Sequence, residues 1–388
     1  MNQQYDPFGG PINGNVPPEG RTTPPGQSPY NNYTNPGGYP PPGYGYRPPY
    51  GPYGQNPQQA AYFAQENRRR LALRTQKQEL RRFGNCIGLA ILAYFLLQLL
   101  FSSLLPVFHL YDTYQSSPVF QSCFNLLFVS IGSVALPFGI MALLNRSRYT
   151  GPVIPTQRVS AGQMGLWVSF GMLCCVAANF VVTFGVIPLF KAFGYGLKSN
   201  GTDDPNSIFA CVIALIGTAI VPAICEEFAM RCCCVQLLRK YGKGFAVLSI
   251  SIVFGLLHGN VIQFVFAFLV GLVLGYLTVK TDSVIPAMLV HALNNGMSVI
   301  ASIVGYASTE KIADSVTVGM YVFWLLVGAA ATIYLLVKKQ LYTPKTQTAP
   351  DPNALTFGQR MGAFFGTPGM IVSFIPLVVL TIFSIQKL

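Results

Sequence analysis

Long apolar runs dominate this sequence. Several uninterrupted stretches reach the roughly 20 residues that a helix needs to cross a bilayer. Only 10% of the 388 residues are charged, against roughly a quarter in an ordinary soluble domain. A backbone in lipid must satisfy its own hydrogen bonds, so these runs predict helices rather than open strands. The sequence therefore predicts an all-α fold, a polytopic bundle of transmembrane helices.

The apolar runs predict eight or nine spans. We expect helices at about 85–107, 122–144, 164–190, 207–238, 245–260, 261–280, 284–306, 316–337 and 368–385. The count depends on the stretch from 245 to 280, where only Gly259 and Asn260 separate two apolar runs. In the eight-span alternative, one of these two helices is short or re-entrant.

Two polar segments precede the first span. Residues 1–60 form a Pro/Gly/Tyr-rich tract without the aliphatic residues of a core, which predicts a disordered tail. Residues 61–83 are strongly basic and contain good helix formers, which predicts a juxtamembrane helix on the inner leaflet. The transmembrane domain then covers 84–388.

The charges predict an orientation. The formal net charge is +12, and basic residues follow the second, fourth and eighth predicted spans. Positive residues favour cytoplasmic loops, so we expect a cytoplasmic N-terminus in a multi-pass membrane protein. No nucleic-acid-binding module accompanies these charges, and the expected partners include membrane lipids but not nucleic acid. The nine cysteines show no zinc-knuckle or disulfide spacing, which favours reduced, packed thiols.

Few ionisable or strongly polar residues lie inside the predicted spans, and such residues are usually functional. The fourth, fifth and seventh spans hold Glu226, Glu227, Arg231, His258, His291, Asn294 and Asn295. Because residues four apart share a helical face, three pairs are predicted: Glu227 with Arg231, Phe254 with His258, and His291 with Asn295.

Depth in the membrane also matches. Glu226, His258 and His291 each lie 11 to 15 residues from a basic anchor, or about 16–23 Å along a helix. A Glu, two His and an Asn from three helices therefore converge at one level, which predicts a water-filled cavity open to the cytoplasm.

These residue types suit amide hydrolysis. Glu226, His258 and His291 suffice to hold a zinc ion with an open position, or to hold and polarise a water directly. Glu226 is the candidate general base, and Asn295 can donate to the oxyanion of a tetrahedral intermediate. Arg231 would neutralise Glu227.

Three motifs carry a resemblance to a known family. Glu226-Glu227-x-x-x-Arg231, Phe254-x-x-x-His258 and His291-x-x-x-Asn295 resemble the motifs of the CPBP family. That family includes type II CAAX prenyl endopeptidases and the bacteriocin-processing or immunity membrane proteases formerly called Abi. The resemblance covers about 207–300.

The resemblance implies an intramembrane endopeptidase of glutamic or metallo type that acts on peptide or membrane-protein substrates. It implies that Glu226 activates the water, that His258 and His291 hold the water or its metal, and that Asn295 stabilises the oxyanion. Glu227 and Arg231 would support the site. The N-terminal tail looks like those of bacterial membrane proteins, so we expect a bacterial cell membrane. The alternatives are a catalytically silent binding or immunity protein and an ion- or proton-coupled transporter.

Overall fold

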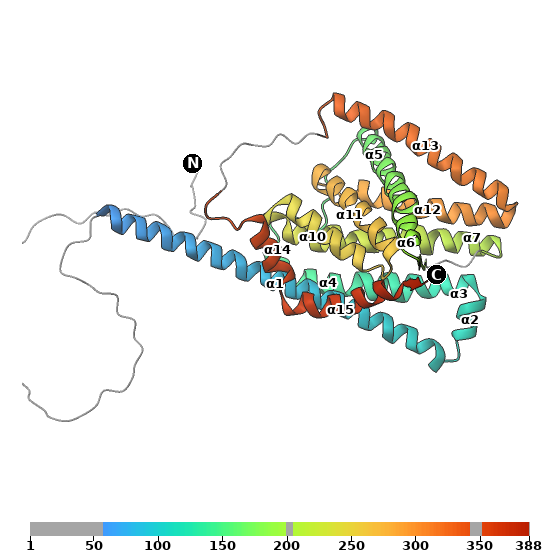
Figure 1. Ribbon diagram of the computed structural model, residues 1–388, viewed down its shortest axis with the longest axis horizontal. Helices are drawn as coiled ribbons and strands as arrows, with labels where there is room; N and C mark the ends of the chain where they lie inside the picture. The colour runs from blue at the N-terminus through green and yellow to red at the C-terminus, as the bar shows by residue number, and fades with distance from the viewer. Residues whose placement is uncertain (1–56, 199–204, 342–350, 388) are drawn as a thin grey trace, which may run out of the picture. The chain divides into compact units, whose positions relative to one another are not determined.

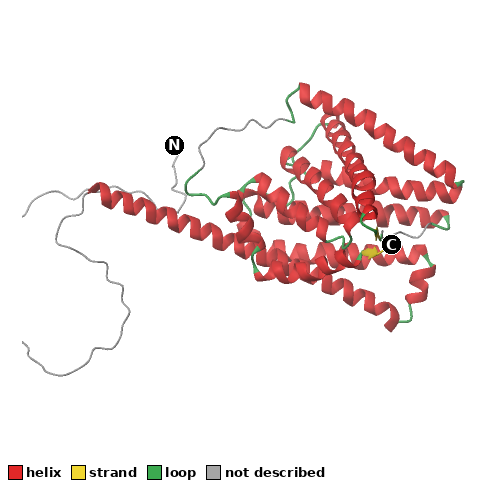
Figure 2. Cartoon of the chain, viewed as in Figure 1, coloured by secondary structure: helices red, strands yellow, loops and turns green. Residues whose placement is uncertain are grey.

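A computed structural model describes residues 57–198, 205–341 and 351–387, and nearly all of this part is helical (Figures 1 and 2). The predicted all-α membrane fold is therefore confirmed. The predicted disordered tail at 1–60 lies outside the described residues, apart from its last few residues, which begin the first helix.

The first helix, α1, runs without a break over 51 residues from Pro57 to Val107. The basic segment predicted at 61–83 as a separate juxtamembrane helix is thus continuous with the first span. No proline interrupts α1 before Pro106, so nothing in the local sequence forces a break between the basic and apolar parts. In Figure 1, the N-terminal part of α1 extends beyond the helices that surround its C-terminal part.

Seven helical stretches of the described chain are long and apolar enough to cross a membrane. They are Gln58–Val107, Pro118–Leu144, Ala161–Ala192, Ile208–Tyr241, Val261–Thr281, Ile285–Ala307 and Glu310–Val337. The helices α14 (Phe357–Phe365) and α15 (Pro368–Phe383) meet at a bend of 75° and would add an eighth span if counted together. The eight-span alternative agrees with the upper count, and nine spans do not.

The difference lies in α10 (Lys243–Leu256), which was predicted to continue to residue 260. It has 14 residues, or about 21 Å, which is short of the roughly 30 Å hydrocarbon core. The chain turns at Gly259, whose φ is +66°, and enters α11 (Val261–Thr281). Small residues let these two helices pack closely: a Cβ on Gly275 would lie 2.8 Å from Val247.

Three of the spans contain π-helical segments, and in each of these spans one such segment is followed by a proline. The first of these spans consists of α3 (Pro118–Phe124), η1 (Asn125–Ala135) and α4 (Leu136–Leu144). The second consists of α5 (Ala161–Phe180), η3 (Val181–Val186) and α6 (Ile187–Ala192). Pro137, Pro188 and Pro222 start the helices after the π segments. Proline lacks an N–H and crowds the carbonyl four residues earlier, which favours a locally widened helix.

The remaining elements are short, apart from two long helices. The long helices are α12 (Ile285–Ala307) and α13 (Glu310–Val337). The short ones are α2 (Tyr111–Ser116) and the 3₁₀ turn η2 (Arg146–Arg148). Strands β1 (Tyr195–Leu197) and β2 (Ile385–Lys387) pair antiparallel, with Tyr195 opposite Lys387.

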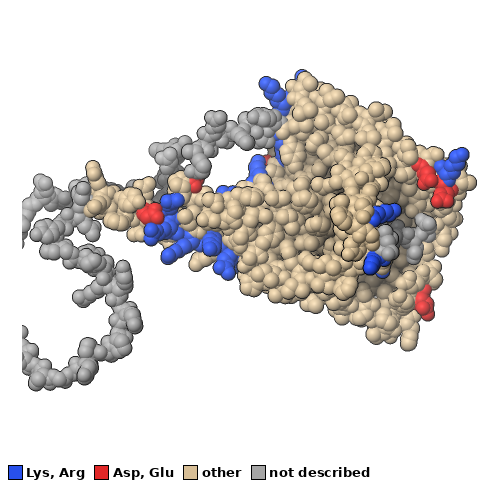
Figure 3. Space-filling view, in the orientation of Figure 1, with Lys and Arg blue, Asp and Glu red and all other residues tan. Residues whose placement is uncertain are grey.

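The loops predicted to be cytoplasmic meet at one end of the bundle. Glu79 on α1 accepts a hydrogen bond from Lys240 at 2.7 Å and lies 3.6 Å from Arg148. Arg239 pairs with Asp282 at 2.7 Å, in the turn between α11 and α12. Figure 3 shows several basic side chains along α1, and both acidic and basic side chains at the opposite end of the bundle. The basic segments therefore share one face, as the charge pattern predicts.

Candidate active site

The two glutamates lie where one long helix changes its winding. The stretch Ile208–Tyr241 contains, in order, α7 (Ile208–Ala214), η4 (Leu215–Ile220), α8 (Val221–Glu227), η5 (Phe228–Val235), α9 (Gln236–Leu238) and η6 (Arg239–Tyr241). Glu226 and Glu227 end α8 between two π-helical segments. Such π segments recur at functional sites because they turn side chains away from regular helical directions.

Pro222 explains part of this geometry. It lacks an N–H, so the carbonyl of Thr218, four residues earlier, cannot receive the usual α-helical hydrogen bond. The Asn295 side chain from α12 donates to that carbonyl instead, with Nδ2 3.3 Å from the oxygen. Asn295 therefore ties α12 to the helix that carries both glutamates.

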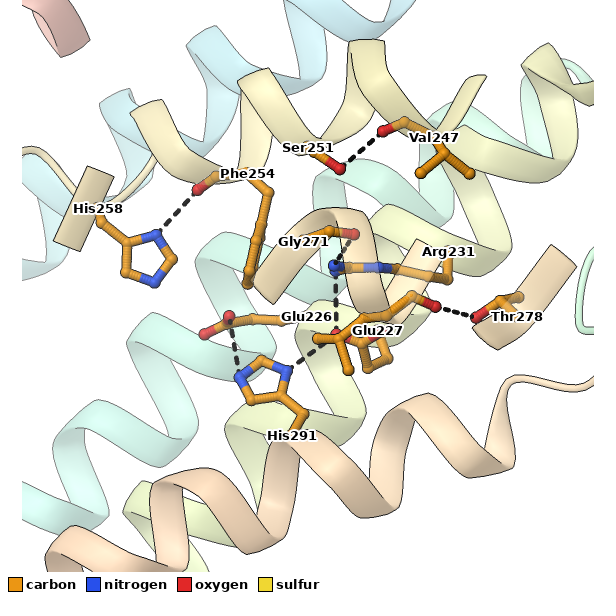
Figure 4. A network of polar contacts seen from close by, with 11 residues as sticks. Glu226, Glu227, Arg231, Val247, Ser251, Phe254, His258, Gly271, Thr278 and His291 are labelled. Atoms are coloured by element: carbon orange, nitrogen blue, oxygen red, sulfur yellow. Dashed lines mark hydrogen bonds and ion pairs between the residues drawn. The ribbon is translucent and has the colours of Figure 1, made fainter. Parts of the chain in front are cut away.

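Glu227 is the centre of a fully buried network (Figure 4). Its Oε1 accepts hydrogen bonds from Arg231 Nη1 at 3.0 Å and from His291 Nδ1 at 2.9 Å. The side chains of Glu227 and Arg231 are only 0% and 2% exposed. Because a buried charge is costly unless it is paired, this contact neutralises both groups. The predicted pairing of Glu227 with Arg231 is present.

Arg231 has further partners that fix its position. Nη2 donates to the Gly271 carbonyl at 3.3 Å, and the guanidinium carbon lies 4.6 Å from the centre of the Phe254 ring. Its contacts therefore join α10 and α11 to the helix that carries both glutamates. Arg231 can support the site without contacting a substrate.

Glu226 differs from its neighbour. Its side chain is 26% exposed, and Oε2 lies 3.8 Å from His291 Nε2. This oxygen is buried and has no hydrogen-bond partner among the described residues. The 3.8 Å separation leaves both atoms within reach of one shared water. Oε2 of Glu227 also lacks a hydrogen-bond partner among the described residues, but the Glu227 side chain is fully buried, so Glu226 is the more accessible of the two carboxylates.

His258 lies on the turn after α10 rather than on the helix itself, because α10 ends at Leu256. Its Nδ1 is 2.9 Å from the Phe254 carbonyl. A carbonyl only accepts, so Nδ1 carries the proton and Nε2 of the neutral ring is an acceptor. The Phe254 ring lies between the two histidines, 5.0 Å from His258 and 5.9 Å from His291, centre to centre.

A cavity of about 450 Å³ joins part of this set. It is lined by Tyr94, Gln98, Val134, Phe138, Glu226, Met230, Phe254, Leu257, His258, Gly259 and Leu380. Glu226 and His258 thus share one cavity, while His291 is buried behind Glu226. Its walls combine apolar side chains with the polar groups of Tyr94, Gln98, Glu226 and His258, which can orient a bound peptide.

Asn295 does not line that cavity. With Asn294 it lines a second one of about 430 Å³ between α5, α12 and α13, together with Asn179, Ser298 and Tyr321. Its amide nitrogen is also engaged by Thr218. The structure therefore brings Glu226, Glu227, Arg231 and His291 together, with His258 across the Phe254 ring, and leaves Asn295 on a separate cavity.

The predicted zinc ligands do not form a ligand set in this structure. Among the described residues, no three His, Cys, Asp or Glu side chains lie at a spacing that would hold a metal ion. Glu226 and His291 face each other, but the Phe254 ring keeps His258 apart. The residues as folded do not fit a three-ligand zinc site.

Two lining residues were missed from the sequence. Tyr94 and Gln98 lie one turn apart on α1 and face the cavity, and the Tyr94 hydroxyl donates to the Leu257 carbonyl at 3.2 Å. Gln98 is a polar residue inside an apolar span, and this signal could have marked the first helix as part of the site.

Comparison with known proteins agrees with this geometry. Residues 208–297 match the family model described as type II CAAX prenyl endopeptidase Rce1-like. The matched segment contains all the residues of the three motifs. No curated protein and no solved structure matches the chain significantly. The segment 208–297 thus matches an Rce1-like domain of the CAAX protease family, and the resemblance predicted from its motifs is confirmed.

Proposed function

We propose that this protein is an intramembrane endopeptidase that hydrolyses peptide bonds with a water activated by Glu226. The observation that carries the proposal is the contrast between two adjacent carboxylates. Oε1 of Glu227 is paired with Arg231 and His291 and the Glu227 side chain is 0% exposed, whereas the Glu226 side chain is 26% exposed and lines the cavity. A desolvated carboxylate beside a polarised water is suited to general-base catalysis.

The proposed reaction starts with a water held between Glu226 and His291, while His258 faces Glu226 from across the cavity. Glu226 accepts one proton as the water oxygen attacks the scissile carbonyl carbon. A tetrahedral intermediate forms, and Glu226 then delivers the proton to the departing amide nitrogen. The C–N bond breaks, which yields a carboxyl and an amino terminus and returns Glu226 to its starting state.

The histidines would place the water. The contact between His258 Nδ1 and the Phe254 carbonyl leaves Nε2 as an acceptor for a water proton. Glu227 accepts from His291 Nδ1, which leaves His291 Nε2 directed at Glu226. Both rings are thereby held in one tautomer, and a fixed ring costs less reorganisation during the reaction.

Asn295 is proposed to act in one of two ways, and its contacts favour positioning. It holds the carbonyl that Pro222 leaves open, and this contact fixes the helix that presents Glu226. An oxyanion role would require the amide to leave Thr218 when substrate binds.

The cavity suggests the kind of substrate. Apolar side chains from η1, α4, η5, α10 and α15 line it, which suits a membrane-associated peptide segment entering beside lipid. We propose peptides or membrane proteins as substrates in general. The proposed location is a bacterial cell membrane with the site open to the cytoplasm.

The test compares cells that carry the wild-type protein with cells that carry Glu226→Gln, using mass spectrometry of new peptide termini. The substitution keeps the side-chain size and removes the base, and immunoblots must show equal membrane insertion. Termini found only with the wild type support proteolysis and reveal the substrate class. Identical peptidomes would overturn the proposal in favour of a silent binding protein.

A further inference from the structure

One face of α1 carries a group of basic residues that the proposed reaction does not use. Arg74, Lys77 and Arg81 recur at helical spacing and line a pocket of about 400 Å³ between α1 and α14. Leu73 and Ala363 contribute apolar surface to the same pocket. Among the residues that the structure describes, no acidic side chain lines it.

Other basic residues at this end of the bundle have acidic partners. Arg69 and Arg70 pair with Glu66, and Arg148 and Lys240 pair with Glu79. In the described ranges, no carboxylate forms an ion pair with any of the three pocket residues. The pocket therefore concentrates positive charge that an anion can neutralise.

Hydrogen bonds hold the two walls of the pocket, α1 and the segment before α14, against each other. The Gln76 side chain donates to the Asn353 carbonyl at 2.7 Å and accepts from the Leu355 N–H at 3.2 Å. Arg69 donates to the Pro352 carbonyl at 2.9 Å. These contacts tie the segment that leads into α14 to one side of α1.

The walls are also in contact on the C-terminal side of Arg81. A Cβ on Gly84 would lie 2.4 Å from the Phe364 carbonyl, so α1 and α14 touch backbone to backbone there. At the next residue of α1, Asn85 accepts from the Gly369 N–H at 2.9 Å. The pocket is therefore a preformed feature between two rigid contacts.

The pocket lies at the edge of the apolar part of α1. Arg81 and Arg82 are the last charged residues before the uninterrupted apolar run. From Arg74 to Arg81 the helix rises about 10 Å, which is enough to cross a lipid headgroup layer of roughly 5–8 Å. The basic face thus has the height and position of the phosphate region of a bilayer.

We propose that this pocket binds the phosphate group of an anionic phospholipid. The three basic side chains neutralise and hydrogen-bond the phosphate, while Leu73, Leu355 and Ala363 contact the glycerol and the upper acyl chains. A soluble phosphate shares the charge chemistry but cannot use the apolar walls or the adjoining lipid. Basic pockets between transmembrane helices are suited to lipid headgroups.

The test uses the full-length protein in detergent with added phosphatidylglycerol, and native mass spectrometry counts retained lipid. The pocket variant is Arg74→Gln/Lys77→Gln/Arg81→Gln. Its matched control, Arg68→Gln/Arg70→Gln/Arg82→Gln, removes the same charge from the same helix but outside the pocket. A basic residue near an anionic membrane contributes about fivefold in affinity, so the pocket variant should bind about 100-fold more weakly.

A second variant fills the pocket without changing its charge. A Cβ on Gly362 meets no atom within 4 Å, so Gly362→Leu should fold and still displace the lipid. Equal losses in the pocket and control variants, or unchanged binding in Gly362→Leu, would overturn the proposal. Full competition by glycerophosphoglycerol or inorganic phosphate would also overturn it and assign the pocket to a soluble phosphate.

Discussion

Glu226 and Glu227 are neighbours in sequence, but their environments suit them to different roles, one in catalysis and one in holding the site together. Glu227 accepts from Arg231 and His291 in a buried network, and Glu226 borders the cavity. Removing one partner of a buried ion pair leaves a charge unpaired, whereas a carboxylate at a cavity wall can be replaced by its amide with little strain. Disrupting the Glu227 network should therefore lower stability, whereas substituting Glu226 should lower the rate of hydrolysis.

The buried pair predicts a stability effect. Arg231→Met should lower the free energy of unfolding by about 3–5 kcal/mol, because Glu227 loses its counter-charge. The matched control is Arg70→Met, which breaks an exposed pair with Glu66 and should cost less than about 1 kcal/mol. Unfolding in mixed micelles measures both. Equal losses would show that the buried network is not held by charge pairing.

Metal dependence follows from the ligand geometry. Because the described residues gather no three-ligand set, we expect the peptidase rate of the purified protein to survive incubation with 1,10-phenanthroline. The non-chelating 1,7-isomer serves as the control. A loss of activity that zinc restores would contradict this expectation and would require His258 to move past Phe254.

The site was largely predictable at the level of residue types. Charged and polar residues are rare in apolar helices, so their presence in predicted spans selected Glu226, Glu227, Arg231, His258 and His291. Their spacing then indicated which of them share a helical face. The contacts of Asn295 were not predictable, because they depend on a carbonyl that Pro222 leaves open in another helix. Tyr94 was hidden because a tyrosine in an apolar run gives no distinct signal.

Among the elements, the helix with π segments matters most for the site. Regular α-helix would place Glu226 and Glu227 on a fixed spiral relative to Thr218. The π segment before Pro222 changes that relation, and the bond from Asn295 holds the result. Prolines after π segments in three spans indicate that this widening is a recurrent solution in the bundle.

This arrangement predicts coupling between Pro222 and Asn295. Asn295→Leu should destabilise the wild-type protein because the Thr218 carbonyl loses its donor. In a Pro222→Ala background the restored N–H supplies a helical donor, so the same substitution should cost less. A double-mutant cycle on the free energy of unfolding should give a coupling of about 0.5–3 kcal/mol. Additive effects would show that Asn295 does not serve this carbonyl.

The element boundaries show where sequence patterns stop being informative. Apolar length predicted most spans well, but it could not place the end of α10, because His258 continues an apolar run although the chain has already turned. Nor could it show that the basic segment and the first span form one helix. Both features depend on neighbouring segments. The turn after α10 contacts α15 and, through Leu257, Tyr94 of α1. The basic part of α1 is held by the segment that leads into α14.

At the scale of the whole described part, the charged loops sort to opposite ends of the bundle. The ion pairs of Glu79 with Arg148 and Lys240 connect three segments that the positive-inside rule assigns to the cytoplasm. The turn between α12 and α13 lies at the other end and is followed by Glu310. One orientation therefore accounts for all of these loops.

Orientation can be tested by labelling introduced cysteines in intact cells with a membrane-impermeant maleimide. Ser308→Cys should react from outside, whereas Gly151→Cys should react only after permeabilisation. The parent protein, labelled in parallel, corrects for its native cysteines. The reverse pattern would place the N-terminus outside and would move the cavity opening away from the cytoplasm.

The central claim is that Glu226 performs the chemistry, and the most direct measurement is the rate of peptide hydrolysis by purified protein in lipid nanodiscs. Glu226→Gln should lower the rate by about 10²–10⁴-fold, while its thermal unfolding stays within the error of the wild type. A variant that hydrolyses peptide at the wild-type rate would contradict the account. So would a loss of rate that is fully explained by unfolding.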